Sequence, residues 1–177
     1  MFEFEKICDG RIASRNGFYI NLMNLSISFK LTGPGWADCN ISFDNQLTVL
    51  TASYLENALG NLADATLRIA QGENLAYAIF AEEPGEYRWK FTKINDKEIS
   101  VEILKFDEWR GLQQSDGEGR TIFKFECPLL VFVRRMVICL SEVLSEYGLE
   151  GYTEKWMMHE FPLEVYNELR NILPALK

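Results

Sequence analysis

The most informative stretch of the sequence is 128–148, PLLVFVRRMVICLSEVLSEYG. From Leu129 to Tyr147, apolar residues recur every three or four positions, which is the period of a helix that buries one wide face. Pro128 suits the first position of a helix because its missing N–H needs no partner there, and Gly148 is a typical helix stop. The stretch therefore predicts the main core helix of the fold.

Strand-like patterns precede this helix. Apolar and polar residues alternate in 25–31 and in 37–43, and Gly33-Pro34-Gly35 separates the two stretches, which indicates a hairpin. The same period of two returns in four segments between residues 76 and 126, which predicts an antiparallel meander. The glycine-rich residues 109–119, before the last of these strands, are expected to form an exposed loop.

Two further helices are predicted. Ser53 and Glu56 have the spacing of a capping box, and a helical period follows until Gly72. A connector over 149–160 leads to a last helix within 161–173. The resulting order is ββαββββαα, an α+β fold in which the helices pack mainly on one face of an antiparallel sheet.

The whole chain, residues 1–177, reads as a single domain. Its length is that of one domain, and no repeat, low-complexity tract or flexible linker divides it. The N-terminus lacks the basic start and apolar run of a signal peptide, and no apolar stretch approaches the roughly 18 residues of a membrane-spanning helix. We therefore expect a cytoplasmic protein with no membrane partner.

The cysteine pattern argues against a metal site. Cys8, Cys39, Cys127 and Cys139 are widely spaced, and the chain has one histidine, so the spacings of structural zinc sites are absent. Three of the four lie in strand-like or helix-like patterns, where a free cysteine usually acts as a small core residue. We expect reduced cysteines, no metal and no cofactor.

Catalytic motifs are also absent from the sequence. There is no nucleophile elbow, Walker-type loop or dinucleotide-binding glycine motif. His159 is the single candidate base, and the carboxylates Glu82, Glu83 and Glu86 surround a turn at 84–85, where exposure would deny them the burial that acid catalysis needs. We expect no catalytic residues; an enzyme would require His159 or a carboxylate pair to meet a partner in one cleft.

Negative charge is concentrated near the C-terminus. The chain has 18 basic and 26 acidic residues and a net charge of −8, which argues against nucleic acid as a partner. Residues 142–168 hold seven glutamates and one lysine, and pairs spaced by four repel on one helix face. This segment is either a solvated face or a docking surface for a basic partner. The candidate partner-binding residues are Glu142, Glu146, Glu150, Glu154, Glu160, Glu164 and Glu168, with Asp116 and Glu118 of the loop.

The C-terminal part of the chain also carries a resemblance to known proteins. The residues concerned are Gly148, Gly151-Tyr152, Trp156 and Phe161-Pro162-Leu163, with Pro84-Gly85-Glu86-Tyr87-Arg88-Trp89 upstream. Over residues 75–173 the chain resembles small uncharacterised bacterial α+β proteins, some of which resemble immunity proteins of polymorphic or contact-dependent toxin systems. The resemblance implies a cytoplasmic protein that binds and blocks a toxin domain, often with acidic residues opposing a basic nuclease active site.

Two classes of function follow from these patterns. The first is a non-enzymatic protein-binding domain, an immunity protein that neutralises a toxin partner through its acidic surface. The alternative is a small-molecule-binding or regulatory domain in which the sheet and a helix enclose an aromatic pocket. The two differ in where the site should lie, on an acidic helix face or inside the fold.

Overall fold

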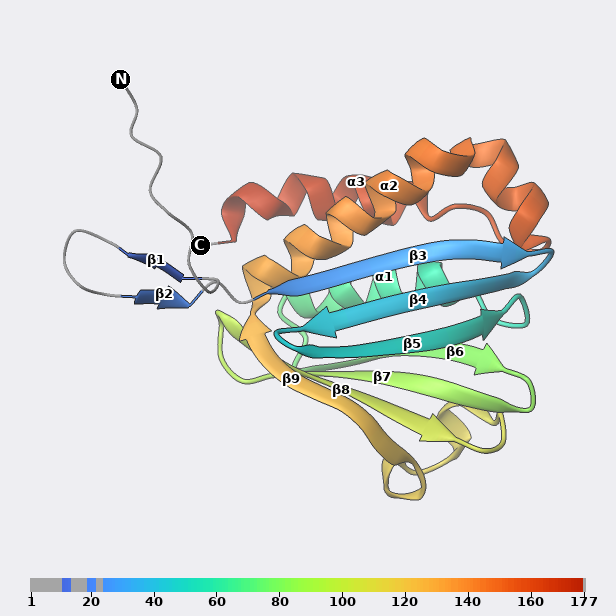
Figure 1. Cartoon of the computed structure of the whole chain (residues 1–177), viewed down its shortest axis with the longest axis horizontal. Helices are drawn as coiled ribbons and strands as arrows, with labels where there is room; N and C mark the ends of the chain where they lie inside the picture. Colours follow the sequence, from blue (N-terminus) through green and yellow to red (C-terminus); the bar gives the residue numbers. More distant parts are fainter. Residues whose placement is uncertain (1–10, 14–18, 22–23, 177) are drawn as a thin grey trace.

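The structure is a computed structural model that describes residues 11–13, 19–21 and 24–176 (Figure 1). Its first two segments are the short strands β1 (Arg11–Ala13) and β2 (Tyr19–Asn21), which pair antiparallel with each other. From residue 24 onward the chain forms a three-stranded sheet, a four-stranded sheet and three α-helices. The expected α+β class and the expected order of elements are confirmed.

The predicted hairpin is present as β3 (Leu25–Gly33) and β4 (Trp36–Phe43). On β3 every second side chain from Leu25 to Leu31 is buried, as the alternation predicts. A third strand, β5 (Gln46–Ser53), pairs with β4 and was not predicted. Its apolar residues do not alternate regularly, because Leu47 and Val49 lie on the exposed face.

The second sheet is the predicted meander, in the order β6-β7-β8-β9. Its strands are β6 (Leu75–Glu82), β7 (Gly85–Lys93), β8 (Glu98–Phe106) and β9 (Arg120–Pro128). Tyr87, Trp89 and Phe91 of β7 face the core. Glu86 and Arg88 therefore project from the opposite face, because successive side chains of a strand alternate.

The three helices cover the inner face of the sheets (Figure 1). They are α1 (Ala58–Ala70), α2 (Leu129–Trp156) and α3 (Leu163–Ile172). In the described part of the chain none of them combines the length and the apolar composition that a membrane crossing requires.

The first helix begins later than the sequence predicts. Ser53 is the last residue of β5 and pairs with Trp36, and α1 does not begin until Ala58, so Ser53 lies too far from the helix to cap it. Asn57 is the cap instead, and its Oδ1 accepts a hydrogen bond from the N–H of Gly60 at 3.2 Å. A Cβ at position 60 would collide with the Asn57 side chain, which explains a glycine inside this helix.

Helix α2 is longer than predicted and is broken once. Gly148 has φ 66° and ψ −178°, so it interrupts the helix as expected, but residues 149–156 are helical and do not form the predicted connector. This last segment buries Tyr152 and Trp156. Its other face, which carries Glu150 and Glu154, is exposed to solvent.

Helix α2 joins the two sheets. Near its start, the ring of Phe132 packs against Phe91 with 5.2 Å between centroids and lies 6.5 Å from Phe125. Near Gly148, the Tyr147 hydroxyl accepts a hydrogen bond from the N–H of Leu31 at 3.2 Å, on the outer edge of β3. The helix thus covers a strand edge that would otherwise be open to another chain.

The contact between α2 and the meander predicts the effect of a single truncation. Phe132→Ala should lower the free energy of unfolding by about 3–5 kcal/mol, because a fully buried ring is replaced by a cavity. Urea denaturation followed by circular dichroism measures it. Ile138→Ala, on the exposed side of the same helix, is the control and should cost about 1 kcal/mol or less. Equal effects of the two substitutions would contradict this description of the core.

Candidate functional site

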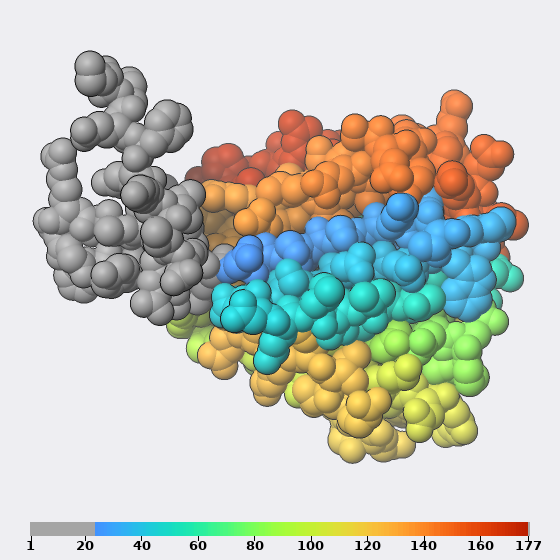
Figure 2. Space-filling model, in the orientation of Figure 1, coloured from blue at the N-terminus to red at the C-terminus, as the bar shows by residue number. Residues whose placement is uncertain are grey.

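The seven candidate glutamates are all exposed, and we call them together the acidic helical surface. Glu142 and Glu146 lie on α2 before Gly148, Glu150 and Glu154 lie after it, Glu160 is in the linker, and Glu164 and Glu168 are on α3. Figure 2 shows both helices, in orange and red, at the surface above β3. No described side chain forms an ion pair with any of the seven.

The one lysine of this segment does not neutralise its neighbours. The ammonium of Lys155 lies 5.6 Å from the centroid of the Tyr147 ring, a cation–π arrangement. Its backbone carbonyl accepts a hydrogen bond from the N–H of Gly35 at 2.8 Å, which ties the end of α2 to the β3–β4 turn. The acidic helical surface therefore keeps its charge.

A groove of about 670 Å³ opens between the end of α2 and the start of α3, and we call it the α2–α3 groove. Most of its wall is apolar, and three glutamates of the acidic helical surface also line it; we call these three its rim. The residues that line it are Leu149, Glu150, Thr153, Glu154, Met157, Glu160, Phe161 and Leu163. The sequence placed the glutamates on an exposed face but gave no sign of a groove beside them.

The backbone at the end of α2 has an uncommon conformation. Met157 has φ 73° and ψ −59°, and the N–H of Met158 donates to the carbonyl of Trp156 at 2.9 Å, so the three residues form a γ-turn with a positive central φ. Trp156 is fully buried, whereas 57% of Met157 and 70% of Met158 are exposed. The turn thus ends the helix and leaves two methionines at the surface, of which Met157 lines the groove.

The remaining two candidates, in the loop between β8 and β9, lie elsewhere. Figure 1 shows this loop on the side of the sheets opposite to α2 and α3. Asp116 is half-buried and accepts from Arg88 at 2.9 Å, from Lys90 at 2.8 Å and from the Tyr77 hydroxyl at 3.0 Å. Glu118 caps a short turn by accepting from the N–H of Ser115. The structure does not bring these residues together with the seven glutamates.

A buried ion pair holds this loop on the outer face of β7. Arg88 and Glu86 are almost fully inaccessible, with 3.0 Å between Nη2 and Oε1. Arg88 also donates to the carbonyls of Gly111 and Gln114 at 2.6 and 2.9 Å. Glu86 accepts from the N–H groups of Arg110 and Gly111 at 3.2 and 2.7 Å. We call Glu86, Arg88 and Asp116 with these loop contacts the Arg88 cluster.

The expectation that Glu86 is an exposed turn carboxylate is therefore wrong. It follows a turn, which lies at 83–84, one residue earlier than the sequence indicates, but the loop folds back over it and excludes water. The available signal was the alternation of charged and aromatic residues from 86 to 91, which places the charges on the non-core face of one strand. The covering loop is contributed by residues more than twenty positions away, so local patterns could not reveal it.

The groups considered for catalysis belong to separate hydrogen-bonded sets. Glu86 is engaged in the Arg88 cluster, and Glu82 pairs with Lys105 at 3.0 Å and accepts from the Tyr87 hydroxyl at 3.0 Å. The imidazole of His159 donates from Nε2 to the carbonyl of Tyr54 at 3.0 Å, between the α2–α3 linker and the end of the first sheet. His159 thus has a structural contact, and these bonds do not join it to either carboxylate.

The three described cysteines are free and buried, as predicted. Burial raises the pKa of the Cys127 and Cys139 thiols to about 12 and raises the pKa of Cys39 well above its ordinary value. Thiols in this state are poor nucleophiles and poor metal ligands. Cys8 lies outside the described residues. Within them, no group of three or more histidine, cysteine, aspartate or glutamate side chains is arranged to hold a metal ion.

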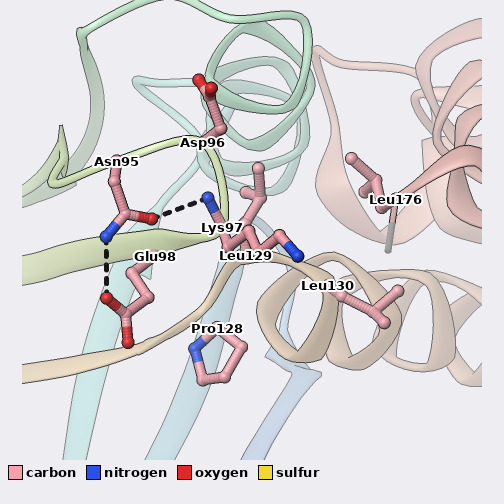
Figure 3. Close-up of a pocket in the computed structure, with 8 residues that line it drawn as sticks. All are labelled: Asn95, Asp96, Lys97, Glu98, Pro128, Leu129, Leu130 and Leu176. Carbon is pink, nitrogen blue, oxygen red and sulfur yellow. Dashed lines mark hydrogen bonds between the residues drawn. The ribbon is translucent and has the colours of Figure 1, made fainter.

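A second hollow, of about 440 Å³, lies at the start of α2 (Figure 3). The Asn95 side chain donates to Glu98 at 2.8 Å and accepts from the N–H of Lys97 at 2.8 Å, so the polar groups of the turn bond to one another. The opposite wall consists of Pro128, Leu129, Leu130 and Leu176. None of the described side chains that line this hollow is aromatic, which differs from the aromatic pocket expected of a ligand-binding domain.

Comparisons with protein-family models, with curated proteins and with solved structures found no match.

The Arg88 cluster predicts a large effect of removing its cation. Arg88→Met should lower the free energy of unfolding by about 3–5 kcal/mol, because Glu86 would remain buried without its partner. Urea denaturation at pH 7 measures the loss. Lys30→Met, at an exposed position of β3, is the control and should change stability by about 0.5 kcal/mol or less. Equal stability of the two variants would show that Arg88 does not stabilise the buried Glu86 and its loop.

The contacts of Asp116 predict that its contribution to the stability of the fold depends on pH. Burial raises the pKa of its carboxyl, but hydrogen bonds from Lys90, Arg88 and Tyr77 outweigh burial and hold the pKa below the ordinary value. A carboxyl of this kind stabilises the fold above the unfolded pKa of about 3.9, and the contribution is lost as the pH falls through the lower folded pKa. Asp116→Asn should therefore lower the melting temperature at pH 7, and this difference from the native protein should shrink below about pH 4.

Calorimetry at pH 7 and pH 3 measures the two differences. Asp107→Asn, an exposed position of the same loop, is the matched control for the loss of one negative charge. A melting-temperature difference for Asp116→Asn that is the same at both pH values would show that the carboxylate is not what stabilises the loop.

Proposed function

We propose that this protein is a non-enzymatic binding protein whose acidic helical surface binds a basic protein partner. The observation that carries the proposal is a contrast between two sets of carboxylates, one paired with cations and one unpaired. The carboxylates of Glu86 and Asp116 are paired with cations inside the protein, whereas the seven glutamates of α2, the linker and α3 have no cation partner among the described residues. Unpaired charges of one sign attract a partner of opposite charge and accelerate association.

The spacing of the glutamates supports this proposal. Glu142 and Glu146 are one helical turn apart on α2, as Glu164 and Glu168 are on α3, so each pair repels by a few tenths of a kcal/mol. Glu164 lies in the first turn of α3, where the helix dipole favours a negative charge. The other three glutamates have no such compensation. A lysine at one position of each pair would stabilise the protein. Stability therefore does not explain this arrangement of glutamates, whereas a binding function does.

The binding surface in this proposal is limited to the helices. The loop 109–119 lies on the opposite side of the sheets, and Asp116 is neutralised by Arg88 and Lys90. A small partner docked on α2 and α3 would not reach it. The loop is therefore left out of the proposed interface.

The finer part of the proposal is that the partner is a toxin domain and that binding neutralises it in the cytoplasm of a bacterium. It is supported by the resemblance of residues 75–173 to immunity-like proteins and by the suitability of an acidic surface for a basic nuclease site. The test is to express the product of the neighbouring reading frame with and without this protein. Relief of killing through a stable complex would support the immunity role, and killing that persists would contradict it for that pair.

Charge reversal predicts slower association with such a partner. The triple variant Glu142→Lys, Glu164→Lys and Glu168→Lys should lower the association rate constant about tenfold or more at low salt, because surface charges act mainly on encounter. Its melting temperature should stay within about 3 °C of the native value, since all three side chains are exposed. Stopped-flow fluorescence and calorimetry measure the two quantities.

The matched control reverses the same number of charges away from the helices. Glu83→Lys, Asp107→Lys and Glu126→Lys are exposed positions on the second sheet and its loops, so the net charge changes equally. Equal slowing by both triple variants would show that net charge alone is responsible and would exclude the acidic helical surface as the interface.

A further inference from the structure

The α2–α3 groove offers apolar contact area within the acidic helical surface. Leu149, Met157 and Leu163 line it with exposed side chains, and Met158, the next residue in the chain after Met157, is exposed too. Exposed apolar side chains are unremarkable when scattered, but a contiguous group that lines a groove is typical of a binding site. Methionine is common in such sites because its flexible thioether adapts to different partners.

The rim of the groove selects the charge of an occupant. Glu150 and Glu154 lie one turn apart on one wall, and Glu160 lies in the linker. None of the three has a cation partner among the described side chains. An acidic occupant would be repelled, whereas lysine or arginine side chains beside an apolar anchor would pair with the rim.

The walls of the groove also select the secondary structure of an occupant. Both are built from α2, the linker and α3, so they present no strand edge to which an extended peptide could add. A helix satisfies its own backbone hydrogen bonds and needs only side-chain contacts. An apolar stripe with flanking basic residues is the helical surface that fits a groove lined by apolar side chains and three glutamates.

We propose that the α2–α3 groove binds a basic amphipathic helix. An apolar side chain of that helix enters between Leu149, Met157 and Leu163, and its basic residues pair with the glutamates at the rim. The inference rests on the proposed function, because it names the part of the basic partner that the acidic helical surface recognises.

The γ-turn at Met157 allows the groove to be altered without damage to the fold. A φ of 73° is unfavourable for methionine and accessible to glycine. Met157→Gly therefore removes an exposed side chain from the groove while keeping a backbone conformation that suits the new residue. Its melting temperature should not fall below the native value, so any loss of binding reports on the groove itself.

Two synthetic peptides serve as probes. The first is an 18-residue peptide of leucine and lysine with one apolar helical face, and the second has the same composition in an order that forms no such face. Fluorescence anisotropy at moderate salt should show that the amphipathic peptide binds about tenfold more tightly than the scrambled peptide. Met157→Gly combined with Met158→Ser should weaken the amphipathic peptide about fivefold or more and leave the scrambled peptide unchanged.

Two control variants separate the groove from the acidic surface. Leu47→Ser removes a side chain that is 67% exposed on β5, outside the groove, and should change neither affinity. Replacing Glu150, Glu154 and Glu160 with glutamine should weaken both peptides, because both carry the same positive charge. If the two peptides bind equally and the methionine variant has no effect, the groove inference is overturned while the proposed function stands. If the glutamine variant also changes neither affinity, the proposed function fails as well.

Discussion

The apolar face of α2 packs against both sheets, and this burial constrains where the other functional groups can lie. Phe132 packs on the aromatic side chains of the meander, and Tyr147 bonds to the edge of β3. With one face of the helix fixed in this way, the polar residues of α2 can only face solvent. Gly148 then breaks the helix, and buried Trp156 anchors its last turns, which places the walls of the α2–α3 groove.

In the described part of the chain, the charged side chains of the Arg88 cluster at the β8–β9 loop are paired with one another, whereas the glutamates on α2 and α3 are not paired. At the loop between β8 and β9, Glu86 and Arg88 are desolvated and paired, and half-buried Asp116 pairs with Arg88 and Lys90, so these charges stabilise one conformation of the loop. On α2 and α3 the glutamates remain solvated and unpaired within the described chain. Such a concentration of unpaired charge on two helices is what the proposed docking surface for a basic partner requires.

Periodicity was sufficient to predict the α+β class and the exposure of the four glutamates in predicted helices, because both follow from which faces of helices and strands are apolar. It missed β5 and the helical residues 149–156, where Glu150 and Glu154 lie. Elsewhere, predictions from local patterns were wrong because contacts between distant parts of the chain determine the structure. Ser53 has capping-box spacing, but the strand pairing of β5 overrides it. Glu86 follows a turn signal, yet a distant loop buries it. The α2–α3 groove depends on the break at Gly148 and the turn at Met157, and the latter has no sequence signature because methionine rarely adopts that conformation.

The central claim is that the end of α2 and the start of α3 form the binding surface. Amide hydrogen exchange, measured by mass spectrometry with and without the amphipathic leucine–lysine peptide, tests it most directly. We predict slower exchange in residues 149–169 on binding, with no change in residues 107–119. Protection confined to the loop 107–119 or to the strands β3–β5 would contradict the account.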